Sequence, residues 1–322
     1  MSRAHSLSDD IFREMNEALM YANRSVSVDT VERHANVIVL GLPRSGTTLV
    51  TQVIFENMAI GCTNNLMARF WMAPLIGCRL SQAVIGSRKG SDLRSHYGTT
   101  ELPWEPHEFS RFWHDLLGVS CRGEWEYPDR SCVNWDRVRE SVCALNNCAE
   151  SALVHKPLEL VGRYLSDFLQ VLHRTVFVYV ERPQMDVACS IAEARVRRGD
   201  GLEKWWSTEL PDKALMGELK GKPFWIQIAA QVAGLRAMYE HEMRALPPAR
   251  LIRVQYQDLV LNPASLLVRI RDATRAVGAE VPIIAEPNAL RSSERMPDRQ
   301  LTSALARGFE TLSGISWPWL ES

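Results

Sequence analysis

The stretch that decides the fold is Val37-Ile38-Val39-Leu40-Gly41-Leu42-Pro43-Arg44-Ser45-Gly46-Thr47-Thr48. It opens with apolar, mostly β-branched residues, which are typical of a buried strand. Two glycines and a proline then predict a tight turn. A helix is expected from about 46 to 58, because apolar residues recur along its inner side at Leu49, Val50, Val53, Ile54 and Phe55.

This turn is suited to bind an anion. Helix N-termini leave amide N–H groups unpaired and carry partial positive charge. A loop of successive N–H groups that leads into one can therefore bind phosphate or sulfate. Gly41 and Gly46 would let the backbone approach such an anion, and the hydroxyls of Thr47 and Thr48 can donate to it. The alternative is an ordinary strand–turn–helix with a glycine-rich corner.

The loop differs from a Walker A motif at one position. Walker A is Gly-x-x-x-x-Gly-Lys-[Ser/Thr], and its lysine reaches the nucleotide phosphates. Gly41 and Gly46 have this spacing, but Thr47 stands where the lysine belongs. Arg44 is the one cation of the loop. We therefore expect a bound phosphate beside a fixed positive charge, with no metal required.

Composition limits the other classes of function. The 322 residues are 46% hydrophobic, enough for a sizeable core. A net charge of −1 provides no global basic field for nucleic acid. Seven cysteines without a CxxC pair indicate a reducing compartment rather than a disulfide framework or zinc site. With no signal pattern and no membrane-span length of apolar residues, we expect a cytoplasmic protein.

The fold class follows from alternating patterns. Short β-branched runs predict strands, and helical spacing separates them, so we expect an α/β fold with a central parallel sheet flanked by helices. Ligands of such sheets bind at the carboxyl ends of the strands. The predicted strands are 37–41, 151–155, 175–180 and 251–255, and the predicted helices are 46–58, 158–171, 184–197, 222–246 and 263–277.

Three regions lie outside this alternation. Residues 1–35 predict an N-terminal helical extension, with an amphipathic helix from about 8 to 22 on the outside of the domain. Residues 66–150 and 199–221 hold several tryptophans and prolines but no clear strand. We interpret both as insertions that cover the site and form an acceptor pocket, which the tryptophans would make aromatic or lipid-like. The alternative is that these tryptophans belong to the core.

A second motif follows the strand at 175–180. It is Val178-Tyr179-Val180-Glu181-Arg182-Pro183-Gln184-Met185-Asp186-Val187-Ala188-Cys189-Ser190. Arg182 lies at the carboxyl end of the strand, Pro183 favours a first helical turn, and Ser190 and Arg195 follow. An arginine at a strand exit can bind phosphate bidentately, and a nearby serine hydroxyl can complete the contact.

Together the two motifs resemble the sulfotransferases that use 3′-phosphoadenosine 5′-phosphosulfate (PAPS). Gly-Leu-Pro-Arg-Ser-Gly-Thr-Thr is similar to their 5′-phosphosulfate loop, and the second motif is similar to their 3′-phosphate motif, with arginine and serine eight residues apart. The run 253–263, which contains Tyr256, is similar to a later tyrosine–acid–leucine strand end. The motifs keep the family's order across about 37–265. An arginine in the first loop is similar to tyrosylprotein sulfotransferases and many bacterial members.

The resemblance implies a P-loop NTPase-like sulfotransferase fold as a single domain over 1–322. It also implies transfer of the sulfuryl group of PAPS to an acceptor hydroxyl, with adenosine 3′,5′-bisphosphate (PAP) leaving. Sulfotransferases are often dimers, which leaves a homodimer open, although the chain contains no interface motif. The residues expected to bind the 5′-phosphosulfate are Arg44, Ser45, Gly46, Thr47 and Thr48, and those expected elsewhere on the nucleotide are Arg182, Ser190, Arg195 and Tyr256.

A late basic loop closes over the nucleotide in family members. Arg291, Arg295 and Arg299 could do so here, or they could form a solvated loop. Tyr256 likewise either contacts the nucleotide or is a buried tyrosine at a strand end.

The acceptor hydroxyl needs a base to take its proton. The candidates are Glu105, His107 and Glu108, in a tryptophan-rich segment about sixty residues past Arg44. A carboxylate is slightly favoured over His107, because other arginine-loop members use glutamate. Lys156, at the end of the strand 151–155, either touches the transferring sulfonate or begins an exposed loop.

The resulting hypothesis is a PAPS-dependent sulfotransferase that acts on a small-molecule hydroxyl. Two alternatives remain. One is a P-loop small-molecule kinase, which the missing lysine at Thr47 disfavours. The other is a nucleotide-binding module that has lost catalysis.

Overall fold

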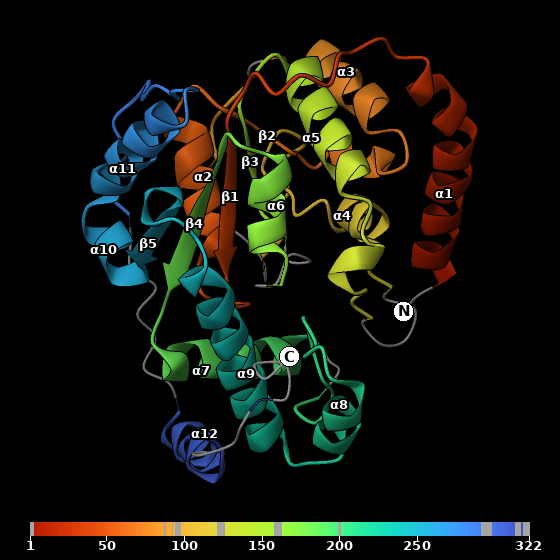
Figure 1. Ribbon diagram of the computed structural model, residues 1–322. Helices are drawn as coiled ribbons and strands as arrows, with labels where there is room; N and C mark the ends of the chain where they lie inside the picture. Colours follow the sequence, from red (N-terminus) through yellow and green to blue (C-terminus); the bar gives the residue numbers. More distant parts are fainter. Residues whose placement is uncertain are drawn as a thin grey trace.

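The computed structural model describes residues 3–86, 88–91, 93, 98–120, 126–157, 163–198, 201–290, 298–312 and 317. A parallel five-stranded sheet with the strand order β2-β3-β1-β4-β5 forms its centre (Figure 1). All four predicted strands are confirmed. The edge strand β2 was not predicted, because two residues are too few for a periodic signal. The strands are β1 (Asn36–Gly41), β2 (Gly61–Cys62), β3 (Leu153–His155), β4 (Thr175–Glu181) and β5 (Leu251–Gln255).

The strand β1, with which the opening stretch begins, lies in the middle of the sheet. β1 pairs with β3 on one side and over its whole length with β4 on the other, from Asn36 opposite Thr175 to Gly41 opposite Val180. Every residue of β1 is buried. Continuous burial explains its continuous apolar sequence, because both faces of a parallel sheet are covered by helices.

Side chains of β1 alternate between two cores. Val37 and Val39 join a cluster with α2 (Thr47–Asn57) and α11 (Pro263–Ala276). Ile38 and Leu40 join the larger cluster on the opposite face, with the helices α5 (Trp135–Ala149), α6 (Leu165–Val171) and α9 (Phe224–Arg244). The fold therefore has three layers, with the helices α2 and α11 on one side and α5 and α6 on the other (Figure 1).

The remaining helices surround these layers. α7 (Gln184–Arg197) confirms the prediction for 184–197, and α10 (Tyr256–Leu261) begins at the predicted strand end. The helix α12 (Arg299–Thr311) packs against α7 and α9. Single 3₁₀ turns lie at Met67–Phe70, Arg130–Cys132 and Pro248–Arg250. None of the described helices has both the length and the apolar content to cross a membrane.

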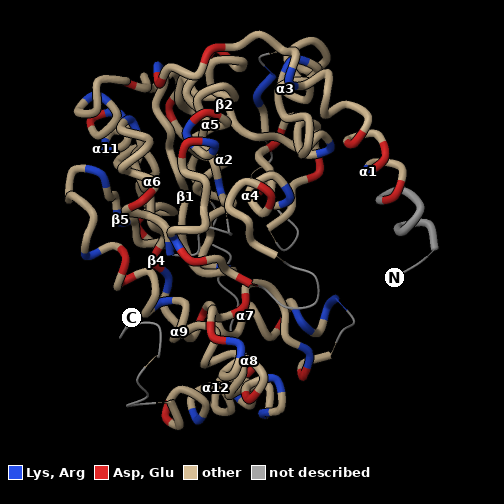
Figure 2. Tube along the Cα trace, turned by 45° about the vertical axis from the view of Figure 1, so that its right-hand side comes forward, with Lys and Arg blue, Asp and Glu red and all other residues tan. Residues whose placement is uncertain are grey.

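The N-terminal extension is a helix on the outside, as predicted. α1 (Arg3–Arg24) is longer than expected and packs against α3 (Pro74–Val84) at the margin of the molecule (Figures 1 and 2). Asn16 anchors it, because its side-chain amide donates to the carbonyl of Arg69 over 2.7 Å and accepts from the amide of Met72 over 2.9 Å.

The two insertions combine helices with irregular segments. Residues 66–150 contain α3, α4 (Ser110–Leu117) and α5, and residues 199–221 contain α8 (Lys213–Lys220). They meet where Lys213 forms an ion pair with Glu126. A cavity of about 310 Å³ lies between them, lined by Gly118, Ser120, Glu126, Tyr127, Pro128, Pro211 and Lys213.

Candidate functional site

The glycine-rich turn joins β1 to α2 at the carboxyl edge of the sheet. Arg44 adopts a left-handed backbone conformation with φ of 69°, and Gly46 caps α2 with φ of 106°. Glycine is required at 46 for a second reason, since a Cβ there would lie 2.5 Å from the ring of Tyr256. The turn is closed by a hydrogen bond from the amide of Ser45 to the carbonyl of Leu42, 3.0 Å long. The amides of the first helical turn therefore face the carboxyl edge of the sheet.

The two sequence motifs meet at this turn. The Nε atom of Arg44 donates to the hydroxyl of Ser190 over 3.1 Å. Arg182 in turn donates from Nη1 to the backbone carbonyl of Arg44 over 3.2 Å. These contacts join residues that are 146 and 138 positions apart in the chain. Two guanidinium groups and a serine hydroxyl thus lie beside a helix N-terminus, which is an anion-binding arrangement.

The third motif, which contains Tyr256, contacts the same turn. The guanidinium of Arg182 lies 4.8 Å from the ring centre of Tyr256, a cation–π contact. Tyr256 therefore packs between Arg182 and Gly46. Among the described residues, the Nε atom of Arg182 is buried without a hydrogen-bond partner, and the Asp186 carboxylate oxygen nearest to it lies 3.9 Å away. A buried donor without a partner fits a ligand with an anionic oxygen.

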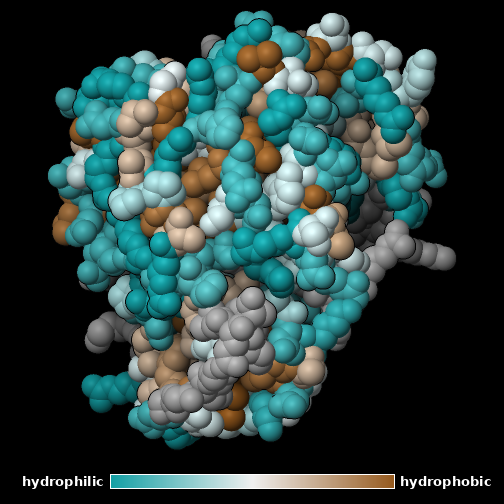
Figure 3. All heavy atoms as spheres, viewed as in Figure 1, coloured by the Kyte–Doolittle hydropathy of each residue, from teal (hydrophilic) through white to brown (hydrophobic). Residues whose placement is uncertain are grey.

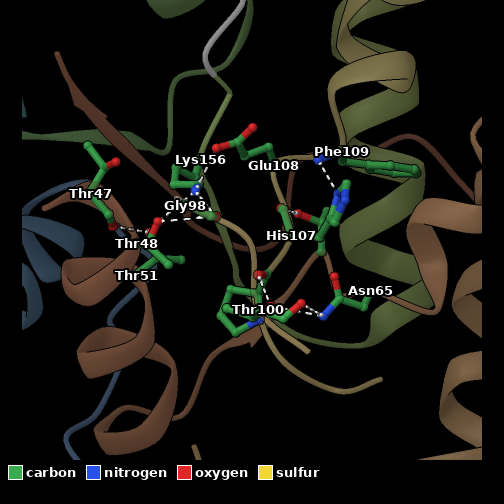
Figure 4. A network of polar contacts seen from close by, with 12 residues as sticks. Thr47, Thr48, Thr51, Asn65, Gly98, Thr100, His107, Glu108, Phe109 and Lys156 are labelled. Carbon is green, nitrogen blue, oxygen red and sulfur yellow. Dashed lines mark hydrogen bonds and ion pairs between the residues drawn. The ribbon is translucent and has the colours of Figure 1, made fainter. Parts of the chain in front are cut away.

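A second polar cluster lies beside the start of α2 (Figure 4). Lys156 directly follows β3, and its side chain is 2% exposed. Its ammonium group donates to the hydroxyl of Thr48 over 2.8 Å and to the carbonyl of Gly98 over 3.1 Å. It also pairs with the carboxylate of Glu108 at 2.8 Å. The structure thus joins two of the predicted catalytic residues and links them to the phosphate loop through Thr48.

The two glutamates near this cluster differ in their surroundings. The side chain of Glu108 is 24% exposed and reaches the cluster from the segment before α4. Glu105 is 2% exposed, and its carboxylate accepts four hydrogen bonds. The donors are the side chains of Gln52 and Ser91 and the backbone amides of Glu101 and Leu102, at 3.3, 2.6, 3.1 and 3.0 Å. These hydrogen bonds fix the Glu105 carboxylate in place, where it stabilises the turn at 101–105.

His107 is neutral and has a defined tautomer. Burial lowers the pKa of its imidazole to about 4, against a smaller opposing effect of Glu108. Its Nδ1 atom accepts a hydrogen bond from the amide of Phe109 over 2.8 Å. The ring proton therefore sits on Nε2. In this arrangement neither nitrogen has a lone pair available to accept a proton.

Arg195 stands apart from the contacts among Arg44, Arg182 and Ser190, and its role at the nucleotide stays a prediction. It lies five residues beyond Ser190 on α7, and 100° per residue carries it to a different face of the helix. Its side chain is fully buried and donates to the carbonyl of Leu202 over 2.9 Å and to the side chain of Gln227 over 3.0 Å. Desolvation by burial lowers the pKa of its guanidinium to about 10.

The late basic residues are only partly described. Arg291 and Arg295 lie outside the described residues. Arg299 is exposed in the first turn of α12. One turn further along, Thr302 bonds to Cys189, the neighbour of Ser190. The helix therefore approaches the Ser190 segment, and a role for Arg299 at the nucleotide stays a prediction.

The described tryptophans of the insertions have different surroundings. Trp113 is fully buried in the core. Trp71 is covered by the guanidinium of Arg111 at 4.4 Å from its ring centre, and Trp205 by that of Arg195 at 5.6 Å. Trp135 packs against Tyr164. Trp113 belongs to the core, and Trp71, Trp135, Trp205 and Trp206 are partly buried and pack against it. Trp125 lies outside the described residues.

Sequence reasoning missed two members of the site region. Gly98 contributes the carbonyl at the centre of the Lys156 cluster, but its neighbours carry no motif. His155 precedes Lys156 and is fully buried, with both ring nitrogens lacking a partner among the described residues. Its ring lies edge-on to Trp113 at 5.6 Å. Successive residues of a strand point to opposite sides. This alternation at the end of β3 is the one sequence signal that could have predicted that His155 points into the core while Lys156 points to the site.

The surface carries no single charged face among the described residues. Lysines and arginines are interspersed with acidic residues along the chain (Figure 2). The face in Figure 3 is mainly hydrophilic, with hydrophobic residues in scattered patches. Among the described residues, no group of three histidine, cysteine or acidic side chains is placed to hold a metal ion.

Several solved structures to which this chain is similar are sulfotransferases. They include STF1 from Mycobacterium tuberculosis H37Rv, at 15% identity and a TM-score of 0.44 over 96% of this chain and 80% of that one. STF9 from Mycobacterium avium has 16% identity and a TM-score of 0.44 over 94% and 73%. The sulfotransferase domain of the curacin biosynthetic pathway has 14% identity and a TM-score of 0.42 over 89% and 93%.

No family model and no curated protein sequence matches the chain. Because the structural similarity is below a TM-score of 0.5, it does not by itself assign an activity to this chain.

Proposed function

We propose that the chain is a sulfotransferase that moves the sulfuryl group of PAPS to the hydroxyl of a small molecule. One observation carries the proposal: Arg44 of the first motif and Ser190 of the second are hydrogen-bonded, and Arg182 donates to the Arg44 backbone. Two motifs far apart in the chain are thus brought together, and each contributes one cation. A nucleotide with phosphate groups at both its 3′ and 5′ positions has the charge distribution that such a site suits.

The donor side would be held by the turn and the second motif. The amides of Ser45 to Thr48 and the guanidinium of Arg44 would bind the 5′-phosphosulfate, as at other helix N-termini. Arg182, whose buried Nε atom has no hydrogen-bond partner among the described residues, and Ser190 would bind the 3′-phosphate. Tyr256 would hold Arg182 in place through the cation–π contact.

The acceptor would react at the Lys156 cluster. Glu108 is the base that we propose, because it is partly exposed there, whereas Glu105 is saturated with hydrogen bonds and His107 has no available lone pair. The acceptor oxygen forms a bond to sulfur, and the bond from sulfur to the bridging oxygen breaks. The hydroxyl proton passes to the Glu108 carboxylate, and PAP leaves with the electron pair. Lys156 would offset charge on the transferring group.

We further propose that the acceptor enters between the two insertions, which meet at the Lys213–Glu126 ion pair. We also propose that the protein works in the cytoplasm. Its six described cysteines are free thiols, as a reducing compartment would keep them.

A thermal-shift titration tests the donor. PAP should raise the melting temperature without magnesium, because a ligand that binds only the native state stabilises it. ATP with magnesium should have little effect, because Thr47 replaces the Walker lysine. A response to ATP–magnesium and none to PAP would instead support the kinase alternative.

A screen of hydroxyl acceptors with radiolabelled PAPS tests catalysis. Label should pass from PAPS to one acceptor class. If PAP binds but no label moves with any acceptor, the inactive nucleotide-binding module is the better description.

A further inference from the structure

Two cysteines of the first insertion lie beside each other on different helices. Cys78 is on α3 and Cys148 is near the end of α5, and these helices pack together (Figure 1). The thiol of Cys78 donates a hydrogen bond to the sulfur of Cys148. Cys78 is 2% exposed and Cys148 is 8% exposed, and both are free thiols. The fold thus brings together two reduced sulfurs that are about 70 residues apart in the chain.

One face of α3 surrounds Cys148. It is formed by Leu75, Cys78, Arg79 and Gln82, whose spacing places them on one side of the helix. The Cys148 thiol donates to the carbonyl of Leu75 over 3.6 Å, and the Gln82 side chain donates to the carbonyl of Cys148 over 3.0 Å. The side chain of Arg79 also hydrogen-bonds to the Cys148 sulfur. Backbone and thiol of Cys148 are therefore both fixed against Cys78.

The surroundings of the two thiols differ in a way that assigns them different roles. The hydrogen bond from Cys78 and the guanidinium of Arg79 lower the pKa of Cys148 to about 7, although burial opposes this. The same hydrogen bond, together with burial, raises the pKa of Cys78. Because the thiolate is the reactive form, Cys148 is the nucleophile of the pair. Cys143 of the same helix contrasts with it, since burial raises the pKa of that thiol to about 11.

We propose that Cys148 is a site of oxidation by hydroperoxides, and that Cys78 resolves the oxidised form as a disulfide between α3 and α5. The Cys148 thiolate attacks one oxygen of hydrogen peroxide, the O–O bond breaks, and hydroxide leaves with the electron pair. The sulfenic acid that forms on Cys148 is then attacked by the sulfur of Cys78. The S–S bond forms, the S–O bond breaks, and water leaves. The two thiols lose two electrons, which reduce the peroxide to two waters.

Access to the pair is from the surface of α3. Arg79 and Gln82 are exposed, and they contact Cys148 from above. A small oxidant therefore has only these two flexible side chains to displace. Neither cysteine is among the residues proposed to bind the nucleotide or the acceptor, so the inference does not depend on the proposed function. In a reducing compartment the pair would stay reduced until the concentration of peroxide rises.

Peptide mapping of the oxidised protein tests the bond itself. The full chain is reduced, freed of reductant, treated with hydrogen peroxide, alkylated and digested without reduction. A cross-link should join the peptides of Cys78 and Cys148, and dithiothreitol should remove it. Cys132 is the exposed competitor and should react more slowly, because exposure alone does not provide a thiolate. Oxidation of Cys132 while Cys78 and Cys148 remain thiols would overturn the inference.

Single variants assign the two roles. Trypsin leaves Cys143 and Cys148 on one peptide, so Cys143→Ser is the matched control and should keep the cross-link. In Cys78→Ser the sulfenic acid should persist on Cys148, where dimedone traps it. Cys148→Ser should give neither a cross-link nor a trapped sulfenic acid at Cys78. A cross-link that survives in Cys148→Ser, or is lost in Cys143→Ser, would contradict the assignment.

Thermal melts show whether the fold is prepared for the bond. A disulfide that closes a loop of about 70 residues without strain should raise the melting temperature by about 5–10 °C. Peroxide-treated Cys78→Ser is the control for oxidation elsewhere and should show no rise. An oxidised protein that melts at or below the temperature of the reduced one would show that the bond forms only by distorting α3 and α5. That result would overturn the inference of a prepared pair.

Discussion

The proposed donor side of the site is built from two contiguous motifs, whereas the proposed acceptor side is assembled from single residues of distant segments. On the donor side, Arg44 and Ser190 each sit within a recognisable run of residues, and both runs directly follow a central strand. On the acceptor side, Gly98, Glu108 and Lys156 come from three segments that share no motif. Main-chain turns fix the first side, and pairing between side chains fixes the second. We therefore expect the two sides to respond differently to substitution.

The largest effect is expected on the donor side, at Arg44. Arg44→Ala removes the loop's cation together with its hydrogen bond to Ser190. Turnover of an acceptor should fall by about 10²–10³-fold, the cost of deleting one preorganised stabilising group. Arg275→Ala, which breaks an exposed pair with Glu280, is the matched control and should keep wild-type turnover. Steady-state kinetics with labelled PAPS measure both variants.

If turnover does not depend on Arg44, the two sides of the site no longer differ in their response to substitution. An Arg44→Ala enzyme within about twofold of wild type would assign the working charge to Lys156 instead.

On the acceptor side, Glu108→Gln should lower kcat by about 10²-fold, because it removes the base while keeping the shape of the side chain. PAP affinity should change less than about twofold, since Glu108 reaches the phosphate loop only indirectly, through Lys156. Glu105→Gln is the internal comparison. It replaces a carboxylate that accepts four hydrogen bonds and should cost about 1–3 kcal/mol of stability with kcat nearly unchanged.

The reverse pattern would exchange the roles of the two glutamates. A stable Glu105→Gln protein without turnover, beside an active Glu108→Gln protein, would show that Glu105 leaves its turn during the reaction.

A smaller effect separates two residues of α7. Ser190→Ala should weaken PAP by about tenfold, because a hydroxyl in contact with Arg44 is lost. Arg195→Met should leave PAP affinity within about twofold and lower the stability instead, because the carbonyl of Leu202 and the side chain of Gln227 lose their donor. Calorimetric titration with PAP, paired with thermal melts, resolves the two. Equal losses of PAP affinity in the two variants would support a place for Arg195 at the nucleotide site.

These contrasts also explain how far the sequence could lead. The strands and the donor loop were predictable, because β-branched runs and the Gly–Arg–Gly spacing are local signals. The same motif logic could not predict the burial of Arg195, since a position on a helix does not reveal which face is buried. The sequence slightly favoured a carboxylate over His107 and did not separate Glu105 from Glu108. Only long-range contacts distinguish them: Ser91 and Gln52 hold Glu105, and Lys156 pairs with Glu108.

The smallest expected effect concerns pH and tests whether His155 belongs to the acceptor side or to the core. Burial lowers the pKa of His155 to about 3 and that of His107 to about 4. In the unfolded chain both would titrate near 6.5. Below that pH the unfolded state binds protons that the native state does not bind. The free energy of unfolding therefore falls as the pH drops from about 6.5 toward 4. Each histidine contributes a slope of up to about 1.4 kcal/mol per pH unit.

His155→Leu should remove about half of this slope, since its two unpartnered nitrogens are replaced by an apolar side chain. Denaturant melts between pH 6.5 and 4.5 measure the slope, and kinetics at pH 7.5 measure activity. A core role predicts an unchanged kcat, because His155 and Lys156 are neighbours in an extended chain and point to opposite sides. A flattened slope together with a lost kcat would mean that the buried imidazole positions Lys156, and that the acceptor side extends through β3 into the core.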